Sequence, residues 1–119
     1  MKNYQKDYKE FIDAYKGKQT SAEEVGELIC RMAQYYSEIN TELGGKTQVV
    51  NMKARDDIES TDELTDKPIS ATKAKVITEA SEVYTDYDKC RKDLQNVEQM
   101  INALKTLQKG VLNEYSHVG

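Results

Sequence analysis

The sequence predicts an all-α protein: a long antiparallel helical hairpin of coiled-coil type, with an additional N-terminal helix that forms a three-helix body at one end. Three observations predict this fold. Apolar residues from Val76 to Tyr115 alternate spacings of four and three, interrupted only at Gln108, and such a heptad pattern gives a helix one continuous apolar seam. An earlier apolar stripe can face that seam. A polar segment with the only proline, Pro68, separates the two.

The composition favours one elongated domain, residues 1–119, over a spherical one. The chain is 38% hydrophobic and 32% charged, and a compact sphere usually has a larger apolar fraction. The net charge is −4 and no block of five basic residues occurs, which argues against generic binding to duplex nucleic acid or to anionic membranes. No apolar stretch has membrane-spanning length, and the first residues lack the apolar core of a signal peptide, so we expect a cytoplasmic protein.

The first expected helix covers residues 2–16, with Gly17 as its stop. The second covers residues 21–58 and begins with a capping box, in which Ser21 and Glu24 satisfy free backbone donors. The apolar face of the first helix contains Tyr4, Tyr8, Phe11, Ile12 and Tyr15, and the stripe of the second contains Val25, Leu28, Ile29, Met32, Tyr35, Tyr36, Ile39 and Leu43.

Gly44 and Gly45 interrupt the second expected helix. Two adjacent glycines cost a helix about 2 kcal/mol relative to alanine, so the helix either bends or ends there. We expect a hinge rather than a stop, because Val50, Ala54 and Ile58 resume a four-residue spacing.

Residues 59–69 are expected to form a loop, and residues 70–115 one long helix. A residue before proline is pushed toward extended geometry, so Lys67 should not be helical. Ser70 is a natural N-cap for the helix that follows. Gly110 could end this helix, but the heptad pattern continues to Tyr115, which favours a helix that continues past it.

A loop centred near residue 64 sets the register of the hairpin. Cys90 should then lie opposite residue 38 and Cys30 opposite residue 98, which places the two thiols about 12 Å apart and excludes a disulfide. Both cysteines fall on apolar stripes, so we expect buried thiols. Tyr84 should face Gly44 and Gly45. Its large ring would then fill the space that the two missing side chains leave.

The stripes widen where a third helix could cover them and become thin between residues 45 and 83. Leu28 and Tyr35 broaden the second helix, and Met100, Leu107 and Leu112 broaden the third. The first helix is expected to cover these regions. A thin two-helix stalk buries little apolar surface, so we expect a homo-oligomer.

The candidate ligand site consists of Tyr84, Tyr87, Lys89 and Arg91. Arg91 could bind a phosphate through two hydrogen bonds while a tyrosine ring stacks on a base. The alternative is an ordinary solvated helix face, because Asp86, Asp88 and Asp93 stand at helical distance from these cations. The tyrosines, in turn, could simply pack at the edges of the core.

A run of uncharged amides follows on the same helix: Gln95, Asn96, Gln99 and Asn102. Exposed helix faces usually carry Glu and Lys, whereas amides suit a partly covered face that must form hydrogen bonds. This run is either part of a subunit interface or ligand pocket, or a coincidence of composition.

No motif for catalysis, a metal or a cofactor is apparent. The acidic stretch from Asp56 to Asp66 lacks the spacing and central glycine of a calcium loop, and we interpret it as a solvated tip that could also contact a basic partner. His117 is the only histidine and has no recognisable nucleophile beside it. A phosphate loop, CxxC and HExxH are also absent from the sequence, so the sequence predicts no enzyme.

The segments KPISATKAKVITEAS and LQNVEQMINALKTLQKGVLNEYSHVG resemble small helical proteins encoded by phages and prophages of Gram-positive bacteria. The resemblance covers about residues 67–119, and its ending NALKTLQKGVLNEYSH is the most specific part. It implies a small phage protein in the host cytosol and transfers no functional residue.

Two functions fit these expectations. The first is a phage binding protein that counters host defence (an anti-defence protein) by sequestering a nucleotide-like signal or by blocking a host protein. The second is an accessory protein for phage recombination or replication, whose coiled-coil surface binds a partner helix. Exposed apolar residues without a small ligand would favour the second function.

Overall fold

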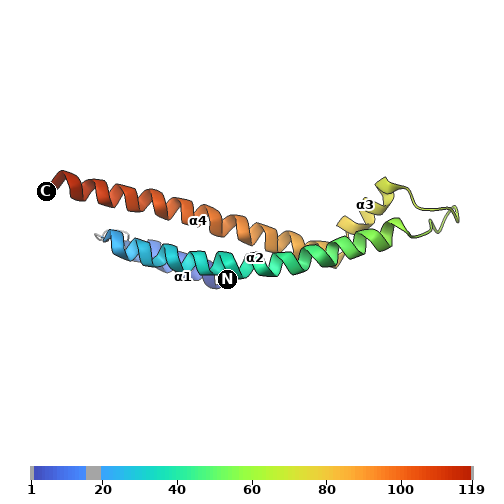
Figure 1. The fold of residues 1–119 in the computed structure, drawn as a ribbon, viewed down its shortest axis with the longest axis horizontal. Helices are drawn as coiled ribbons and strands as arrows, with labels where there is room; N and C mark the ends of the chain where they lie inside the picture. The colour runs from blue at the N-terminus through green and yellow to red at the C-terminus, as the bar shows by residue number, and fades with distance from the viewer. Residues whose placement is uncertain (1, 16–19, 119) are drawn as a thin grey trace. The chain divides into compact units, whose positions relative to one another are not determined.

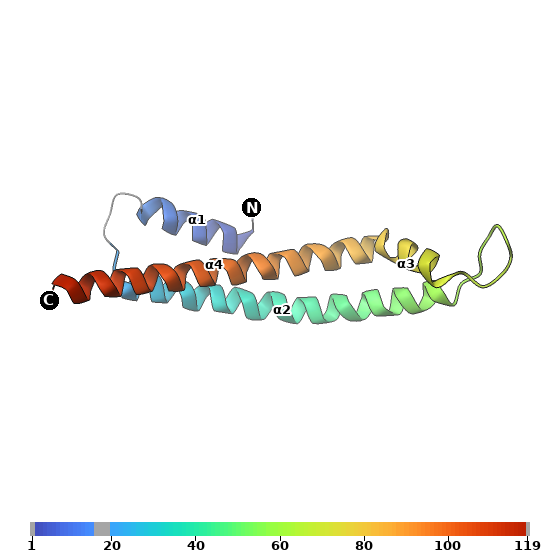
Figure 2. The ribbon, with the colours of Figure 1, turned by 90° about the horizontal axis from the view of Figure 1, so that it is seen from above.

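The computed structural model describes residues 2–15 and 20–118, with side chains up to residue 113. Over these residues the chain is all-α and forms α1 (Asn3–Tyr15), α2 (Ala22–Ile58), α3 (Ala71–Glu79) and α4 (Glu82–Val118), as Figure 1 shows. The long helices α2 and α4 run in opposite directions, which the colours of Figure 2 make visible. The predicted all-α hairpin with an additional N-terminal helix is confirmed.

The chain divides into two compact units. The first unit comprises Met1–Glu38 and Leu94–Gly119, and therefore contains α1, the beginning of α2 and most of α4. The second unit comprises Ile39–Asp93, with the remainder of α2, the whole of α3 and the beginning of α4.

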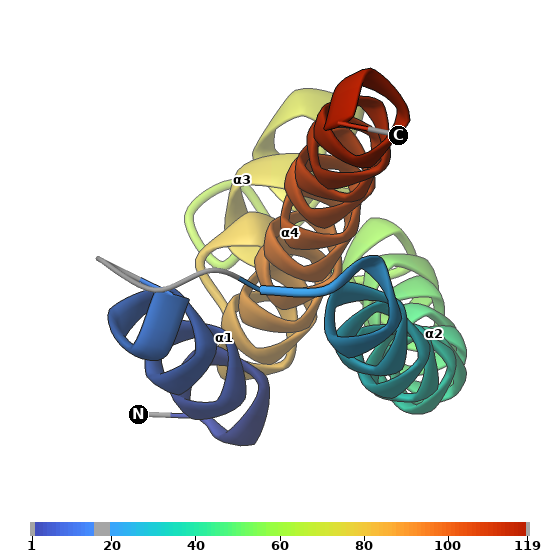
Figure 3. The same ribbon diagram turned by 90° about the vertical axis from the view of Figure 1, so that its left-hand side faces the viewer.

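The first unit is a three-helix body with a continuous apolar core. Figure 3 shows its three helices, α1, α2 and α4, grouped side by side. Val97, Leu104 and Val111 follow each other at heptad spacing along α4, and all three are buried, as the seam predicts. The core of this unit contains Tyr4, Val25, Leu28, Met32, Val97, Leu104 and Val111.

The second unit has a smaller apolar core. Its buried apolar residues are Ile69, Ala74 and Cys90. Two buried polar residues, Asp57 of α2 and Thr78 of α3, lie among them. The hydrogen bond between these two side chains therefore helps to hold α3 against α2, a role that apolar packing has in the first unit.

The N-caps predicted at Ser21 and Ser70 are present, but Glu24 bonds to Thr20 and not to the Ser21 N–H as the capping box predicts. Ser21 Oγ accepts the backbone N–H of Glu24 at 3.1 Å, and Ser70 Oγ accepts that of Lys73 at 3.2 Å. The Glu24 carboxylate accepts a hydrogen bond from Thr20 Oγ1 at 2.7 Å. The expected stop at Gly17 falls within residues 16–19, outside the described residues.

The single helix expected over residues 70–115 is wrong, because the chain leaves the helical path at Ala80 and Ser81. Ser81 donates to the Thr78 carbonyl from both its backbone N–H (3.1 Å) and its hydroxyl (2.6 Å). The same hydroxyl accepts the Tyr84 N–H at 3.4 Å. Serine is among the best N-cap residues, so Ser81 ends α3 and starts α4.

This break also changes the beginning of the seam. Val76 and Ala80 are expected on the apolar seam, but both are exposed. The first buried residue of α4 is Cys90. Beyond Gly110, α4 continues to Val118, in agreement with the expected continuation.

Gly44 and Gly45 do not end α2, which runs through both. The expectation that Tyr84 fills the space beside them is wrong, because a Cβ atom built on either glycine would meet no heavy atom within 4 Å. Both residues are exposed, so their lack of a side chain serves no packing purpose in this unit.

Replacing Gly44 or Gly45 by alanine is therefore expected to stabilise α2. Glycine in a helix interior is about 1 kcal/mol less favourable than alanine, and no neighbouring atom opposes the added methyl group. Urea denaturation followed by far-UV circular dichroism should show a higher midpoint for Gly44→Ala and Gly45→Ala.

Gly26→Ala is the matched control in the same helix. Its Cβ would lie 3.1 Å from Gln108 Nε2, which donates to the Ala22 carbonyl at 3.0 Å. Gln108, the one interruption of the heptad, thus uses the room that Gly26 leaves. The gain from Gly26→Ala should be smaller than that from Gly45→Ala, and equal gains would contradict this difference in packing.

The register of the hairpin is close to the expected one. Cys90 was placed opposite residue 38, and its Sγ lies 3.6 Å from the carbonyl oxygen of Ile39. Neither Cys30 nor Cys90 forms a disulfide. The expected burial is correct for Cys90 and wrong for Cys30, which is exposed, because Ile29 and not Cys30 turns toward the interior of the first unit.

Candidate functional site

Three of the four candidate ligand-site residues share one face of α4. The spacing of Tyr84, Tyr87 and Arg91 places them on successive turns of the helix, and the rings of Tyr84 and Tyr87 lie 5.6 Å apart with an interplanar angle of 50°. Lys89 is exposed but is two positions after Tyr87, which turns it to another side of the helix. The structure thus groups Tyr84, Tyr87 and Arg91 and separates Lys89 from them.

Asp88 pairs with two neighbouring cations, Arg91 and Lys92. Its carboxylate accepts from Arg91 Nη2 at 2.6 Å and from Lys92 Nζ at 2.9 Å. Lys92 and then Arg91 lower the pKa of the Asp88 carboxyl, and Asp88 in turn raises the pKa of the Arg91 guanidinium. The arrangement corresponds to the solvated ion-paired alternative, and an incoming phosphate would have to displace Asp88 from Arg91.

The four amides of α4, Gln95, Asn96, Gln99 and Asn102, are all exposed. Asn96 Nδ2 lies 3.5 Å from the hydroxyl of Tyr4 in α1. This contact joins one of the four amides to α1. A subunit interface over the other amides stays a prediction.

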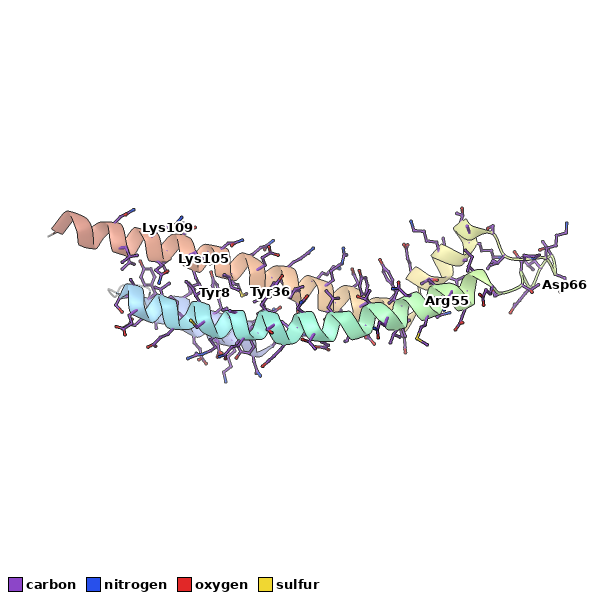
Figure 4. The ribbon with its side chains drawn as sticks, viewed as in Figure 1. Tyr8, Tyr36, Arg55, Asp66, Lys105 and Lys109 are labelled. Carbon is purple, nitrogen blue, oxygen red and sulfur yellow. The ribbon has the colours of Figure 1, made fainter. Side chains whose placement is uncertain are left out.

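Several tyrosines of the first unit have a structural role. Tyr4 is buried, and the hydroxyl of Tyr35 donates to Asp7 Oδ2 at 2.6 Å. This hydrogen bond raises the pKa of Tyr35. Tyr8 and Tyr36, labelled in Figure 4, are half-buried. Tyr4 and Tyr35 therefore form hydrogen bonds across helices, and Tyr8 and Tyr36 are partly covered, as the packing interpretation expects.

A polar node joins α2 to α3 in the second unit. The hydroxyl of Thr78 donates to Asp57 Oδ2 at 2.6 Å, and Lys53 Nζ lies 2.6 Å from Asp57 Oδ1. Lys53 and then Thr78 lower the pKa of Asp57. Asp57 was expected in a solvated acidic stretch, which is wrong, because its side chain is buried between the two helices.

Asp62 organises the loop between α2 and α3. Its backbone N–H donates to the Lys67 carbonyl and its own carbonyl accepts from Asp66 N–H, both at 2.8 Å. One carboxylate oxygen accepts the N–H of Leu64 at 2.9 Å and the other accepts from Lys73 Nζ at 2.8 Å. Lys73 and the Leu64 N–H lower the pKa of Asp62. Asp62 thus supports the loop instead of standing free in solvent.

Exposed apolar side chains are concentrated in the second unit. Met52 of α2 is 65% exposed, Val76 of α3 is 62% exposed and Leu64 of the loop is 89% exposed. Among the described residues, the exposed large apolar side chains of this unit are Val49, Met52, Ile58, Leu64, Val76 and Ile77, and that of the first unit is Leu112.

Sequence reasoning missed this surface because it assigned Val76 to the hairpin seam. The N-cap preference of Ser81 was the signal that could have corrected it. Once α3 is separated from α4, the hydrogen-bonded Thr78 faces α2, and Val76, two residues earlier, must point away from it.

Among the described residues, no group of three His, Cys, Asp or Glu side chains could hold a metal ion. In that same part of the chain, every helix is too short or too polar to cross a membrane. The side chain of His117 lies outside the described side chains. Comparison of the sequence and structure with family models, curated proteins and solved structures found no match.

Proposed function

We propose that this chain is a non-enzymatic binding protein that docks onto a partner protein through its second unit. The observation that carries the proposal is the contrast between the units: the first buries most of the apolar core, whereas the second exposes most of the large apolar side chains among the described residues. Exposed apolar groups gathered in one region are typical of protein interaction surfaces.

The second unit holds these side chains on a fixed framework. The hydrogen bond from Thr78 to Asp57 fastens α3 to α2, and Ser81 fixes the turn into α4. Val49 and Met52 are three residues apart on α2 and so lie on one side of it. A framework that is already ordered lowers the entropy cost of binding.

Binding without turnover fits the ionisable side chains of this unit. Asp57, Asp62 and Asp88 each accept hydrogen bonds from a cation of the same unit. These contacts stabilise the helices and the loop, so the three carboxylates have a structural role. The resemblance of residues 67–119 to phage proteins would make the partner a host or phage protein in the cytosol.

Capture of a nucleotide-like signal is the second candidate, supported by the ring pair of Tyr84 and Tyr87 next to Arg91. It is the less favoured candidate because Arg91 Nη2 already pairs with Asp88 at 2.6 Å. A native mass spectrum of the purified chain separates the candidates. Added mass of nucleotide size that Arg91→Ala removes would support capture.

Site-specific photo-crosslinking tests the proposed docking. A benzophenone amino acid replaces Met52 or Val76 in the second unit, and replaces Leu112 in the first unit as the control, in cells that naturally produce the chain. We expect a protein adduct of one defined mass from positions 52 and 76 that is absent from position 112. Equal adducts at all three positions, or none, would contradict docking through the second unit.

A further inference from the structure

The loop between α2 and α3 presents an apolar side chain at an exposed position of an ordered segment. Leu64 is 89% exposed, the highest exposure of the large apolar residues in the described part of the chain. The loop projects beyond the end of α2 and the start of α3 in both Figure 1 and Figure 2. Leu64 therefore lies where a partner can reach it without contact between the partner and the helices.

Backbone contacts close this loop at its base. Thr61 and Pro68 form an isolated antiparallel bridge, and Ile69 N–H donates to the Ser60 carbonyl at 3.1 Å. Ile69 is buried. At the tip, the Leu64 N–H donates to Asp62 Oδ1. These contacts fix the backbone that carries Leu64, which lowers the entropy cost of inserting its side chain into a pocket.

Acidic side chains flank this leucine. Glu63 precedes it and Asp66 follows two residues later, and both are exposed; Figure 4 labels Asp66 in the projecting loop. Asp62, by contrast, is half-buried and is paired with Lys73. The charges open to a partner at the tip are thus those of Glu63 and Asp66, together with the exposed Lys67.

We propose that Leu64 inserts into an apolar pocket of the partner protein that is bordered by Lys or Arg side chains. The inference rests on the proposed function and deepens it by naming the chemistry of the partner's site. Apolar burial would supply affinity through Leu64. The carboxylates of Glu63 and Asp66 would match the basic border and speed association, because complementary charges mainly raise the rate of encounter.

The experiment first identifies the protein that crosslinks to a benzophenone amino acid placed at position 64, in cells that naturally produce the chain. The purified crosslinked protein is then titrated with the wild-type chain, Leu64→Ala and the control Leu112→Ala. We expect Leu64→Ala to bind about tenfold more weakly or worse, and Leu112→Ala to bind like the wild type. Circular dichroism should show equal folding of all three, since both leucines are exposed.

The variant Glu63→Gln/Asp66→Asn tests the charge component. Asp66 has φ 53°, and asparagine tolerates this left-handed conformation, so the loop should keep its shape. The association rate is expected to fall about three- to tenfold at low salt, and to depend less on salt than that of the wild type.

Three outcomes would overturn the inference: no adduct at position 64, an adduct with a second copy of this chain, or wild-type affinity of Leu64→Ala. Adducts at positions 52 and 76 combined with wild-type affinity of Leu64→Ala would reject the role of Leu64 and retain docking through the second unit. Absence of adducts at positions 52, 64 and 76 would reject both.

Discussion

Leu104→Ala is expected to lower the free energy of unfolding by about 2–5 kcal/mol. Leu104 of α4 is 1% exposed and belongs to the core of the first unit with Val97 and Met32. Truncation removes buried methyl groups and leaves a cavity that the surrounding helices can only partly fill. Since a small domain is stable by only about 5–15 kcal/mol, this loss is a large fraction of the total. Urea denaturation followed by circular dichroism measures it.

Leu112→Ala is the control for this prediction. It changes the same residue type in the same helix, but Leu112 is 51% exposed. An exposed substitution of this kind usually changes stability by about 0.5 kcal/mol or less. If both variants lost the same stability, Leu104 would not be packed in a specific core, and the three-helix body of the first unit would be a loose assembly.

The sequence allowed correct prediction of the features that depend on local chemistry and on long periodicity. The caps at Ser21 and Ser70 follow from side chains that bond to nearby backbone N–H groups. The heptad positions Val97, Leu104 and Val111 are buried as predicted, because a helix that keeps this spacing has one apolar side. The position of the loop centre near residue 64 sufficed to place Cys90 opposite residue 38, one residue from the observed neighbour Ile39.

The break between α3 and α4 could not be predicted from spacing alone. Val76, Ala80 and Val83 keep the heptad spacing across Ser81, so an apolar period gives no sign of an interruption. Serine is tolerated inside a helix and favoured at its start. The tertiary hydrogen bond between Thr78 and Asp57, which fixes the orientation of α3, joins residues far apart in the sequence.

The candidate ligand site illustrates a second limit. The sequence places Asp86, Asp88 and Asp93 among the cations of this segment, and helical spacing allows Asp88 to pair with Arg91 or with Lys92. Only the three-dimensional arrangement shows that Asp88 pairs with both. Gly44 and Gly45 show the same limit. The sequence shows that both lack a side chain, but it does not show whether a neighbouring side chain fills the space beside them.

Thr78→Val is expected to destabilise the second unit by about 1–3 kcal/mol. Valine keeps the shape of threonine but removes the hydroxyl that donates to Asp57 Oδ2 at 2.6 Å. That oxygen would then be buried without its donor, and an unsatisfied buried acceptor retains its full desolvation cost. The apolar core of this unit is small, so the bond between α2 and α3 should carry an unusually large share of its stability.

Amide hydrogen exchange reports local opening residue by residue, so it is the decisive measurement for Thr78→Val. We expect faster exchange in α3 and in the part of α2 within the second unit, and unchanged exchange in the core of the first unit. Thr106→Val, which removes an exposed hydroxyl bonded to the Asn102 carbonyl within α4, should leave both units within about 0.5 kcal/mol of the wild type. Unchanged exchange of α3 in Thr78→Val would mean that apolar contacts alone hold it. In that case the exposed Val76 and Ile77 would not depend on the polar node for their position, and apolar contacts instead of the hydrogen bond from Thr78 to Asp57 would fix the docking surface.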